Sequence, residues 1–182
     1  MYTSGSNDGE FPAPLHWEAP YLTIRNIRED EIRQVSSILA DAALWLERSG
    51  RPMWREGQYS VEGLLSSYRK AQMYLGFIGA QAAATLILEV EDRLPWPNDA
   101  PAFYLHKLAV RRQYAGTGLA EAVIGWAKHQ ARVQGKRYLR LDCAADRPGL
   151  RAFYERQGFV CVRETLVLNK YPTALYESKI DK

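Results

Sequence analysis

The sequence predicts one α/β (α+β) domain in which helices cover a mixed central sheet. Two segments, 32–46 and 119–131, repeat apolar residues at the three- and four-residue spacing of an amphipathic helix. Short apolar or alternating runs between and after them are separated by Gly and Pro, which is typical of strands. The chain has 182 residues, 47% of them hydrophobic, enough for one domain with a sizeable core. Helices interleaved with a hairpin in this way favour a sheet covered by helices.

The first 20 residues differ in composition from the rest. They are rich in Gly and Pro and carry few periodic apolar positions, so we expect a flexible segment over 1–20 and a globular domain over 21–182. Asp8 and Glu10 stand where a signal peptide needs a basic region and an apolar core. No apolar run approaches the roughly 20 residues that span a bilayer. We therefore expect a cytoplasmic protein without a membrane partner.

The first half of the domain contains two helices between strands. The patterns predict, in order, a strand over 22–26, a helix over 32–46, a shorter helix over 60–68, and a hairpin over 73–78 and 81–91. Acidic residues 29–31 complement the positive end of the first helix dipole, and Gly50 ends that helix. Ser60 begins the second helix.

The second half alternates strands with helices. Prolines at 95, 97 and 101 break the chain before it resumes. The patterns then predict a strand over 102–110, a glycine-containing segment over 111–118, a long helix from 119, a strand over 138–143, a helix over 150–157, and strands over 160–168 and 174–180. Gly135 and Gly158 end the two helices.

Charge and cysteine usage disfavour several classes of function. The net charge of +3 suits an anionic small ligand as well as nucleic acid. The two cysteines, Cys143 and Cys161, have no CxxC spacing and no companion histidine, so we expect reduced thiols and no metal. A short basic cluster lacks interleaved aromatic residues and has acidic surroundings, so it indicates a solvated surface and no nucleic-acid partner. Its members are Arg132, Lys136, Arg137 and Arg140.

The most informative segment joins the strand over 102–110 to the long helix. It contains Gly116 and Gly118, and the helix follows at once. Such a turn presents several main-chain N–H groups at a helix N-terminus, where they bind a diphosphate. Glycine also lets the main chain approach phosphate oxygens without a Cβ in the way. The segment predicts a phosphate-binding turn over Gln113, Tyr114, Ala115, Gly116, Thr117, Gly118 and Leu119.

Three phosphate-binding motifs compete for this turn. A P-loop requires Lys and Ser or Thr after its last glycine, but Leu119 and Ala120 follow Gly118. A dinucleotide-binding fingerprint requires a third glycine where Glu121 stands. The remaining pattern, Gln/Arg-x-x-Gly-x-Gly/Ala, is met by Gln113, Gly116 and Gly118, although it is weak when taken alone.

A second motif strengthens that pattern. A strand, Leu139-Arg140-Leu141-Asp142-Cys143, precedes a short helix that ends in Tyr154-Glu155-Arg156-Gln157-Gly158-Phe159. Both motifs, in this order and at this separation, resemble the GNAT superfamily of N-acetyltransferases. The resemblance spans about residue 21 to the C-terminus. It implies a mixed sheet of six to seven strands flanked by about four helices, splayed between the fourth and fifth strands.

The resemblance implies acetyl-CoA as co-substrate and no metal. The pantetheine arm is then expected between the strands over 102–110 and 138–143, pairing with the main chain at Leu108, Ala109 and Val110. The diphosphate is expected on the amides of 113–119. One departure from the family pattern concerns Arg147, which stands where many relatives carry an asparagine, and this puts one usual coenzyme contact in doubt.

The implied reaction is acetyl transfer from the thioester to a primary amine by direct attack. An alkylamine has a pKa of roughly 10, so it must lose a proton before it attacks. Tyr154 matches the tyrosine that many GNAT enzymes place near the thioester sulfur, and we expect it to act as general acid. The alternative is a core tyrosine packed beside Phe153 and Phe159.

The general base that removes the amine proton has several candidates in the sequence. The run Leu105-His106-Lys107-Leu108-Ala109-Val110 resembles that of arylalkylamine N-acetyltransferase, in which strand histidines help to remove the amine proton. Only His106 of that pair is retained, because Tyr104 occupies the other position. Strand alternation places His106 on one face with Leu108 and Val110, along the coenzyme cleft. A structural histidine is the alternative, and Glu47, Glu56 and Asp142 are other candidates.

The acceptor pocket of this superfamily is built from the first two helices, their connecting loop and the loop before the last strand. These parts contain aromatic residues that suit an ammonium-bearing or aromatic substrate, and we expect Trp54, Tyr59 and Tyr104 to bind it. Tyr171 is a further candidate, whereas Trp45 adjoins the apolar stripe of its helix and is interpreted as core. The amine is a small molecule or a peptide, and a homodimer is left open. A non-catalytic, acetyl-CoA-binding regulatory module is the alternative function.

Overall fold

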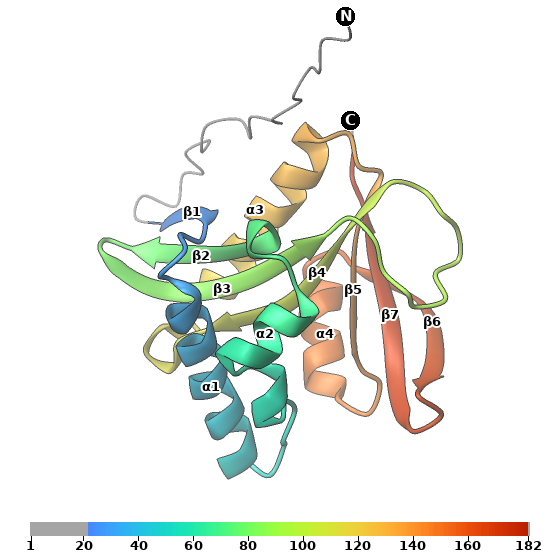
Figure 1. Cartoon of the computed structure of the whole chain (residues 1–182). Coiled ribbons are helices and arrows are strands. Elements are labelled where there is room, and N and C mark those ends of the chain that lie inside the picture. The colour runs from blue at the N-terminus through green and yellow to red at the C-terminus, as the bar shows by residue number, and fades with distance from the viewer. Residues whose placement is uncertain (1–21, 182) are drawn as a thin grey trace, which may run out of the picture.

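The computed structural model describes residues 22–181, and the segment 1–20 therefore lies outside the described residues. The described part contains seven strands and four α-helices, whose arrangement Figure 1 shows. The strands are β1 (Leu22–Asn26), β2 (Met73–Ile78), β3 (Gln81–Glu89), β4 (Ala102–Val110), β5 (Tyr138–Ala144), β6 (Val160–Val167) and β7 (Tyr171–Lys179). The helices are α1 (Ile32–Arg48), α2 (Val61–Ser67), α3 (Leu119–Val133) and α4 (Pro148–Arg156).

All seven strands form one mixed sheet in the order β1-β2-β3-β4-β5-β7-β6. Every neighbouring pair is antiparallel except β4 and β5, which are parallel. These two strands pair only over 102–104 and 138–140, and beyond that point they diverge. The predicted mixed sheet with a splay between its fourth and fifth strands is thus confirmed.

Helices cover both faces of the sheet. Figure 1 shows α1 and α2 on one face and α3 and α4 on the other. The buried apolar residues form two clusters, one on each side. The α1–α2 side is built on Leu39, Leu64 and Ile87, and the α3 side on Val123 and Leu139. Each fully buried side chain of this size stabilises the fold by about 1.5–3 kcal/mol, so the two clusters hold the splayed strands in place.

The helix signals in the sequence are largely confirmed. Ser60 caps α2, and its Oγ accepts a hydrogen bond from the Gly63 amide at 3.1 Å. Gly50 follows α1 with φ +68°, a conformation that favours glycine. The acidic residue next to α1 does more than complement a dipole: Glu31 binds the Arg25 guanidinium through both carboxylate oxygens at 2.7 Å. This ion pair lowers the pKa of Glu31 to about 2.

The middle of β4 departs from regular alternation. His106 pairs with Ile87 of β3, yet Ala109 pairs with Thr85, so β4 carries one extra residue. Lys107, with φ +52°, occupies this bulge. Because the bulge reverses the alternation, Leu108 and Val110 pack with the α3-side cluster while His106 lies on the α1–α2 side of the sheet. The expectation that these three residues share a face is therefore wrong.

Candidate functional site

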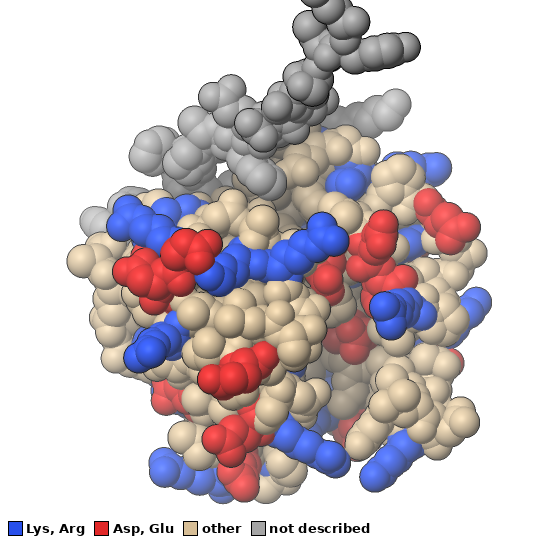
Figure 2. Space-filling view, in the orientation of Figure 1, with Lys and Arg blue, Asp and Glu red and all other residues tan. Residues whose placement is uncertain are grey.

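A cavity of about 820 Å³ lies in the gap between β4 and β5. The diverging parts of the two strands, 105–110 and 142–144, line its base. We call residues 112–120 together with 150–154 of α4 the turn wall, and residues 53–58 together with 167–173 the loop wall. Figure 2 shows this face of the molecule hollowed between the side of α1 and α2 and the side of β6 and β7.

The glycine turn supplies unpaired main-chain donors to the turn wall. Gly116 and Gly118 have φ of +76° and +84°, and a Cβ added to either would meet no atom within 4 Å. Within the described residues, the N–H groups of Gly116, Gly118 and Leu119 form no hydrogen bond. Ala115 and Ala120 line the cavity on either side of them. The turn is therefore a set of amides at a helix N-terminus, open to an anion.

The side chains of this turn hold its shape. Gln113 and Tyr114 both bind the Gln81 side chain, at 3.1 and 2.8 Å. Arg111 donates to the carbonyl of Ala82 at 2.9 Å. Their interactions fasten the turn to β3. Of the two consecutive arginines before this turn, Arg111 and Arg112, only Arg112 lines the cavity, with its guanidinium 4.0 Å from the centre of the Trp45 ring.

Tyr154 projects from α4 into the turn wall. Its ring packs edge-on against Phe153 and Phe159, at 5.4 and 5.9 Å between centroids. Its hydroxyl forms no hydrogen bond with the described residues, and the side chain lines the cavity. Burial, together with the nearby Cys143 and Asp142, raises the pKa of Tyr154, so the hydroxyl keeps its proton at neutral pH. The packing beside Phe153 and Phe159 is therefore present, the hydroxyl has no hydrogen-bond partner among the described residues, and the role of general acid stays a prediction.

His106 lies between two carboxylates. Its Nε2 is buried and stands 3.4 Å from Oε2 of Glu89, and its Nδ1 stands 3.8 Å from Oδ1 of Asp142. Burial raises the pKa of Glu89 and also that of Asp142. Asp142 lines the cavity and Glu89 does not, so Nδ1 is on the cavity side of the ring. The ring of Tyr68 lies 6.1 Å away.

Glu89 is a residue of this site that sequence reasoning missed. It ends β3 opposite Tyr104, two residues along from the pair of Ile87 and His106, so its side chain lies on the same face of the sheet, diagonally next to His106. This neighbourhood depends on the register between β3 and β4, which no local pattern shows. The other two acidic candidates for a base, Glu47 and Glu56, do not line the cavity.

The predicted acceptor residues are distributed unevenly. Trp54 lines the cavity, as Tyr171 does. Tyr59 instead packs against the α1–α2 cluster, and Tyr104 is buried beneath Trp96 with ring centroids 5.6 Å apart. Neither of these two residues lines the cavity. Trp45, interpreted as core, lies on the cavity surface.

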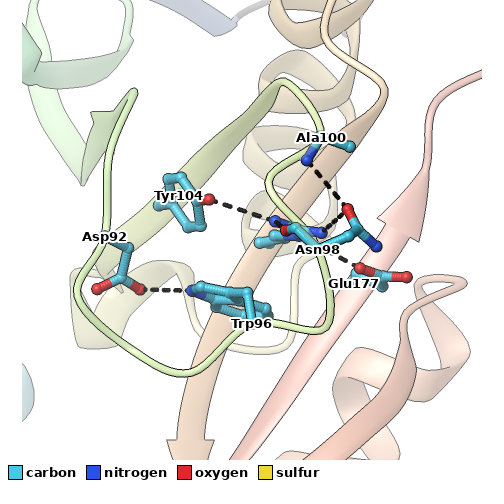
Figure 3. A network of polar contacts seen from close by, with 7 residues as sticks. Asp92, Trp96, Asn98, Ala100, Tyr104 and Glu177 are labelled. Carbon is cyan, nitrogen blue, oxygen red and sulfur yellow. Dashed lines mark hydrogen bonds and ion pairs between the residues drawn. The ribbon is translucent and has the colours of Figure 1, made fainter.

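A buried arginine closes the base of the gap. Arg140, interpreted from sequence as part of a solvated basic surface, is fully buried, so that interpretation is wrong. Its guanidinium binds the Glu177 carboxylate at 3.2 Å, donates to the Asn98 side chain at 2.9 Å and to the Tyr104 hydroxyl at 3.3 Å. Figure 3 shows how these partners converge from β4, β7 and the loop before β4.

The same network fixes the long loop over 90–101. The Trp96 indole donates to Asp92 at 3.1 Å and its ring lies 5.1 Å from the Arg140 guanidinium (Figure 3). Arg140 belongs to the last residue pair of β4 and β5, opposite Tyr104. The network therefore lies where the two strands begin to diverge.

Two arginines connect parts of the loop wall that are distant in sequence. Arg147, which precedes α4, donates to the carbonyl of Arg51 at 2.9 Å and also to that of Pro52. Arg55 donates to the Tyr171 hydroxyl at 3.3 Å. The residue that replaces a family asparagine thus contacts the loop after α1.

Lys107 places a cation on the cavity surface. Its Nζ lies 5.1 Å from the centre of the Trp54 ring. Burial lowers the pKa of Lys107 to about 8, and the nearby Asp142 opposes that change. Among the described residues, no set of three or more His, Cys, Asp or Glu side chains is placed to hold a metal ion. None of the helices within 22–181 has the length and apolar character to cross a membrane.

The chain is similar to known acetyltransferases in sequence and structure. YesJ of Bacillus subtilis, an uncharacterised N-acetyltransferase, is 31% identical over 139 residues, which cover 71% of this chain and 77% of YesJ. A GNAT-family acetyltransferase from Listeria monocytogenes shares the fold with a TM-score of 0.71 and 21% identity, over 87% of this chain and 94% of that one. The PaiA N-acetyltransferase of Thermoplasma acidophilum, solved in complex with coenzyme A, shares the fold with a TM-score of 0.67 and 15% identity, over 87% of this chain and 98% of that one.

The family assignment rests on the extent of the match. Residues 39–159 match the acetyltransferase (GNAT) family, and this range runs from the middle of α1 to the end of the second motif. It contains β4, which lines the base of the cavity, and the glycine turn and α4, which build the turn wall. This match covers more than half of the sequence, and the chain therefore belongs to the acetyltransferase (GNAT) family.

Proposed function

We propose that the protein is an N-acetyltransferase that uses acetyl-CoA and transfers the acetyl group to a primary amine of a small molecule or peptide. The observation that carries this proposal is one cavity that joins three features. The turn that carries the unpaired amides of Gly116, Gly118 and Leu119 reaches this cavity at Ala115 and Ala120, and the side chains of Tyr154 and His106 line it. The turn wall fits the diphosphate of coenzyme A, because Gly116 and Gly118 leave free space in front of unpaired N–H donors.

The diverging strands fit an extended thioester arm. Leu108, Ala109 and Val110 follow the bulge and line the cavity beyond the last β4–β5 pair. Their main chain therefore borders the gap, where it can pair with an amide-containing chain. Bound there, acetyl-CoA supplies the activated acetyl group. The relative with coenzyme A in its structure supports this assignment by its fold.

Two side chains move the protons. His106 accepts the proton of the amine, directly or through water. Its Nδ1 faces the cavity and its Nε2 lies beside Glu89. Glu89 orients the ring, since a carboxylate next to one ring nitrogen fixes which nitrogen carries the proton. Tyr154 keeps its proton because its pKa is raised, so it can protonate the departing thiolate.

The test is a measurement of coenzyme A thiol release with acetyl-CoA and a panel of primary amines and peptides. We expect amine-dependent release, which an acetylated product identified by mass spectrometry confirms. Binding of acetyl-CoA without amine-dependent release for any member of the panel contradicts the proposal and favours the non-catalytic module.

A further inference from the structure

The charges that line the cavity are mostly positive. Besides His106, the ionisable Lys, Arg, Asp and Glu side chains that line it are Arg55, Lys107, Arg112 and Asp142. Two of the three cations have partners: Arg55 binds the Tyr171 hydroxyl, and Arg112 stacks on Trp45 beside the glycine turn. Lys107 differs from both.

Lys107 forms no ion pair and no hydrogen bond within the described residues, although Asp142 is near enough to favour its charged form. Its Nζ lies over the ring of Trp54. Removing an ammonium group from water costs free energy unless an anion or hydrogen-bond acceptors replace the water. The lowered pKa of Lys107 reflects the same cost. Such a position is stabilised by a ligand that brings a negative charge.

The bulge sets this cation beside the reactive end of the cavity. His106 and Lys107 are consecutive, and both line the cavity together with Asp142. An acceptor amine at His106 and Asp142 therefore has Lys107 as its neighbour. The face of Trp54 is already occupied by Lys107, which disfavours the aromatic ammonium site expected from sequence.

We infer that the acceptor is an amine that also carries a carboxylate close to the amino group, as an amino acid does, and that Lys107 binds this carboxylate. This inference rests on the proposed acetyl transfer for its biological meaning. It goes beyond that proposal by assigning the substrate class and a residue that determines specificity. Asp142 and His106 then receive the amino end, and the ammonium of Lys107 the anionic end, of one zwitterionic molecule.

The experiment compares acceptors that differ in one group. Each of a set of amino acids is paired with its carboxamide, which keeps the amine and side chain but removes the negative charge. For the parent protein we expect kcat/KM to be about tenfold or more higher for the acids, because a charge-assisted hydrogen bond is lost in the amides. Lys107→Gln should remove this preference, mainly through KM, and leave the carboxamides within about threefold of the parent.

Two control variants complete the design. Lys107→Arg keeps the cation and should keep most of the preference for acids. Lys136→Gln removes a lysine that does not line the cavity and should leave the preference unchanged. Equal loss of rate for acids and amides in Lys107→Gln overturns the inference, because it assigns Lys107 to the coenzyme or to the fold. Equal kcat/KM for acids and amides in the parent overturns it as well.

A binding measurement separates this inference from the proposed reaction. Because Lys107 lies against Trp54, a bound carboxylate should change the tryptophan fluorescence, and Trp54→Phe should remove that change. A carboxylate-dependent change in the parent that is absent in Lys107→Gln supports the anion site even if no amine is acetylated. An identical response of both proteins to the acids and to the amides overturns it.

Discussion

The two walls of the cavity are held in different ways. The turn wall presents main-chain amides from a short segment, and its side chains Gln113 and Tyr114 are turned away to bind Gln81. The loop wall presents side chains, and it is held by hydrogen bonds between residues about one hundred positions apart, such as Arg55 with Tyr171. The binding properties of the turn wall therefore depend on its backbone conformation, whereas substitution of side chains can change the chemistry of the loop wall. The turn wall suits a constant ligand and the loop wall a variable one.

The largest effect is expected at the Arg140 network, where β4 and β5 begin to diverge. Arg140→Met leaves the half-buried Glu177 carboxylate without its partner, and the cost should approach, without reaching, the about 3–5 kcal/mol of a fully buried pair. Thermal unfolding should therefore show a strongly lowered Tm. The double variant Arg140→Met/Glu177→Gln should recover part of the loss. An unchanged Tm for Arg140→Met would show that the network contributes little to holding the strands at the point where they diverge.

The turn wall is tested by a charge placed on its backbone. Gly118→Glu should weaken acetyl-CoA binding by about 100-fold, which corresponds to about 2.7 kcal/mol, because the new carboxylate opposes a diphosphate at the helix N-terminus. Gly118→Ala is the matched control, since it carries the same strain at φ +84° without the charge. Calorimetry with both variants separates the two effects. Equal affinity of both variants for acetyl-CoA would show that the diphosphate does not bind at this turn.

Tyr154 tests whether the turn wall also acts through a side chain. Tyr154→Phe keeps the contacts of the ring with Phe153 and Phe159 and removes the hydroxyl. Loss of a general acid should lower kcat by about 100-fold, with little change in acetyl-CoA affinity. Single-turnover kinetics and calorimetry measure the two quantities. If kcat stays at the parent value where chemistry limits the rate, the hydroxyl donates no proton in the reaction.

A smaller effect is expected from the groups around His106. His106→Gln should lose activity near neutral pH by about tenfold to 100-fold and recover part of it in alkali, where free amine is plentiful. Glu89→Gln should lower kcat by less than His106→Gln does, with little change in KM, because the carboxylate 3.4 Å from Nε2 orients the ring. The titratable groups that surround the ring are Tyr68, Glu89, Asp92, Lys107 and Asp142.

The rate profile should be measured with an amine of low pKa as well as with an ordinary alkylamine. A change that appears with both amines reports ionisation of the enzyme, whereas one that differs between them reports ionisation of the substrate. If His106→Gln keeps the rate and the ascending limb of the parent with both amines, the histidine is structural. An unchanged kcat in Glu89→Gln would show that this carboxylate does not orient the histidine.

What the sequence could predict follows the same division. The turn wall could be predicted from the sequence because its requirements are local: Gly116 and Gly118 adopt positive φ, and the segment joins a strand to a helix. The loop wall could be predicted only in part. Tyr59 and Tyr104 are aromatic residues in the expected segments, but burial against the core and beneath Trp96 depends on contacts that no local pattern shows.

Arg140 and Lys107 show why the rest was hidden. The burial of Arg140 requires Asn98 and Glu177, which are 42 and 37 positions away, so a basic cluster in sequence looks solvated. Lys107 stands in a run that reads as an ordinary strand, and the extra residue becomes visible only from the pairing with β3. Long-range pairing, not local propensity, decides both positions.

The bulge at Lys107 divides β4 into two segments of opposite phase. Residues 102–106 follow one alternation and residues 108–110 the other, so substitutions in one segment need not disturb the side-chain directions of the other. Deletion of Lys107 would make His106 and Leu108 consecutive, and regular alternation would then still place their side chains on opposite faces. The left-handed backbone conformation is therefore confined to Lys107, and the strand on either side of it keeps a regular alternation.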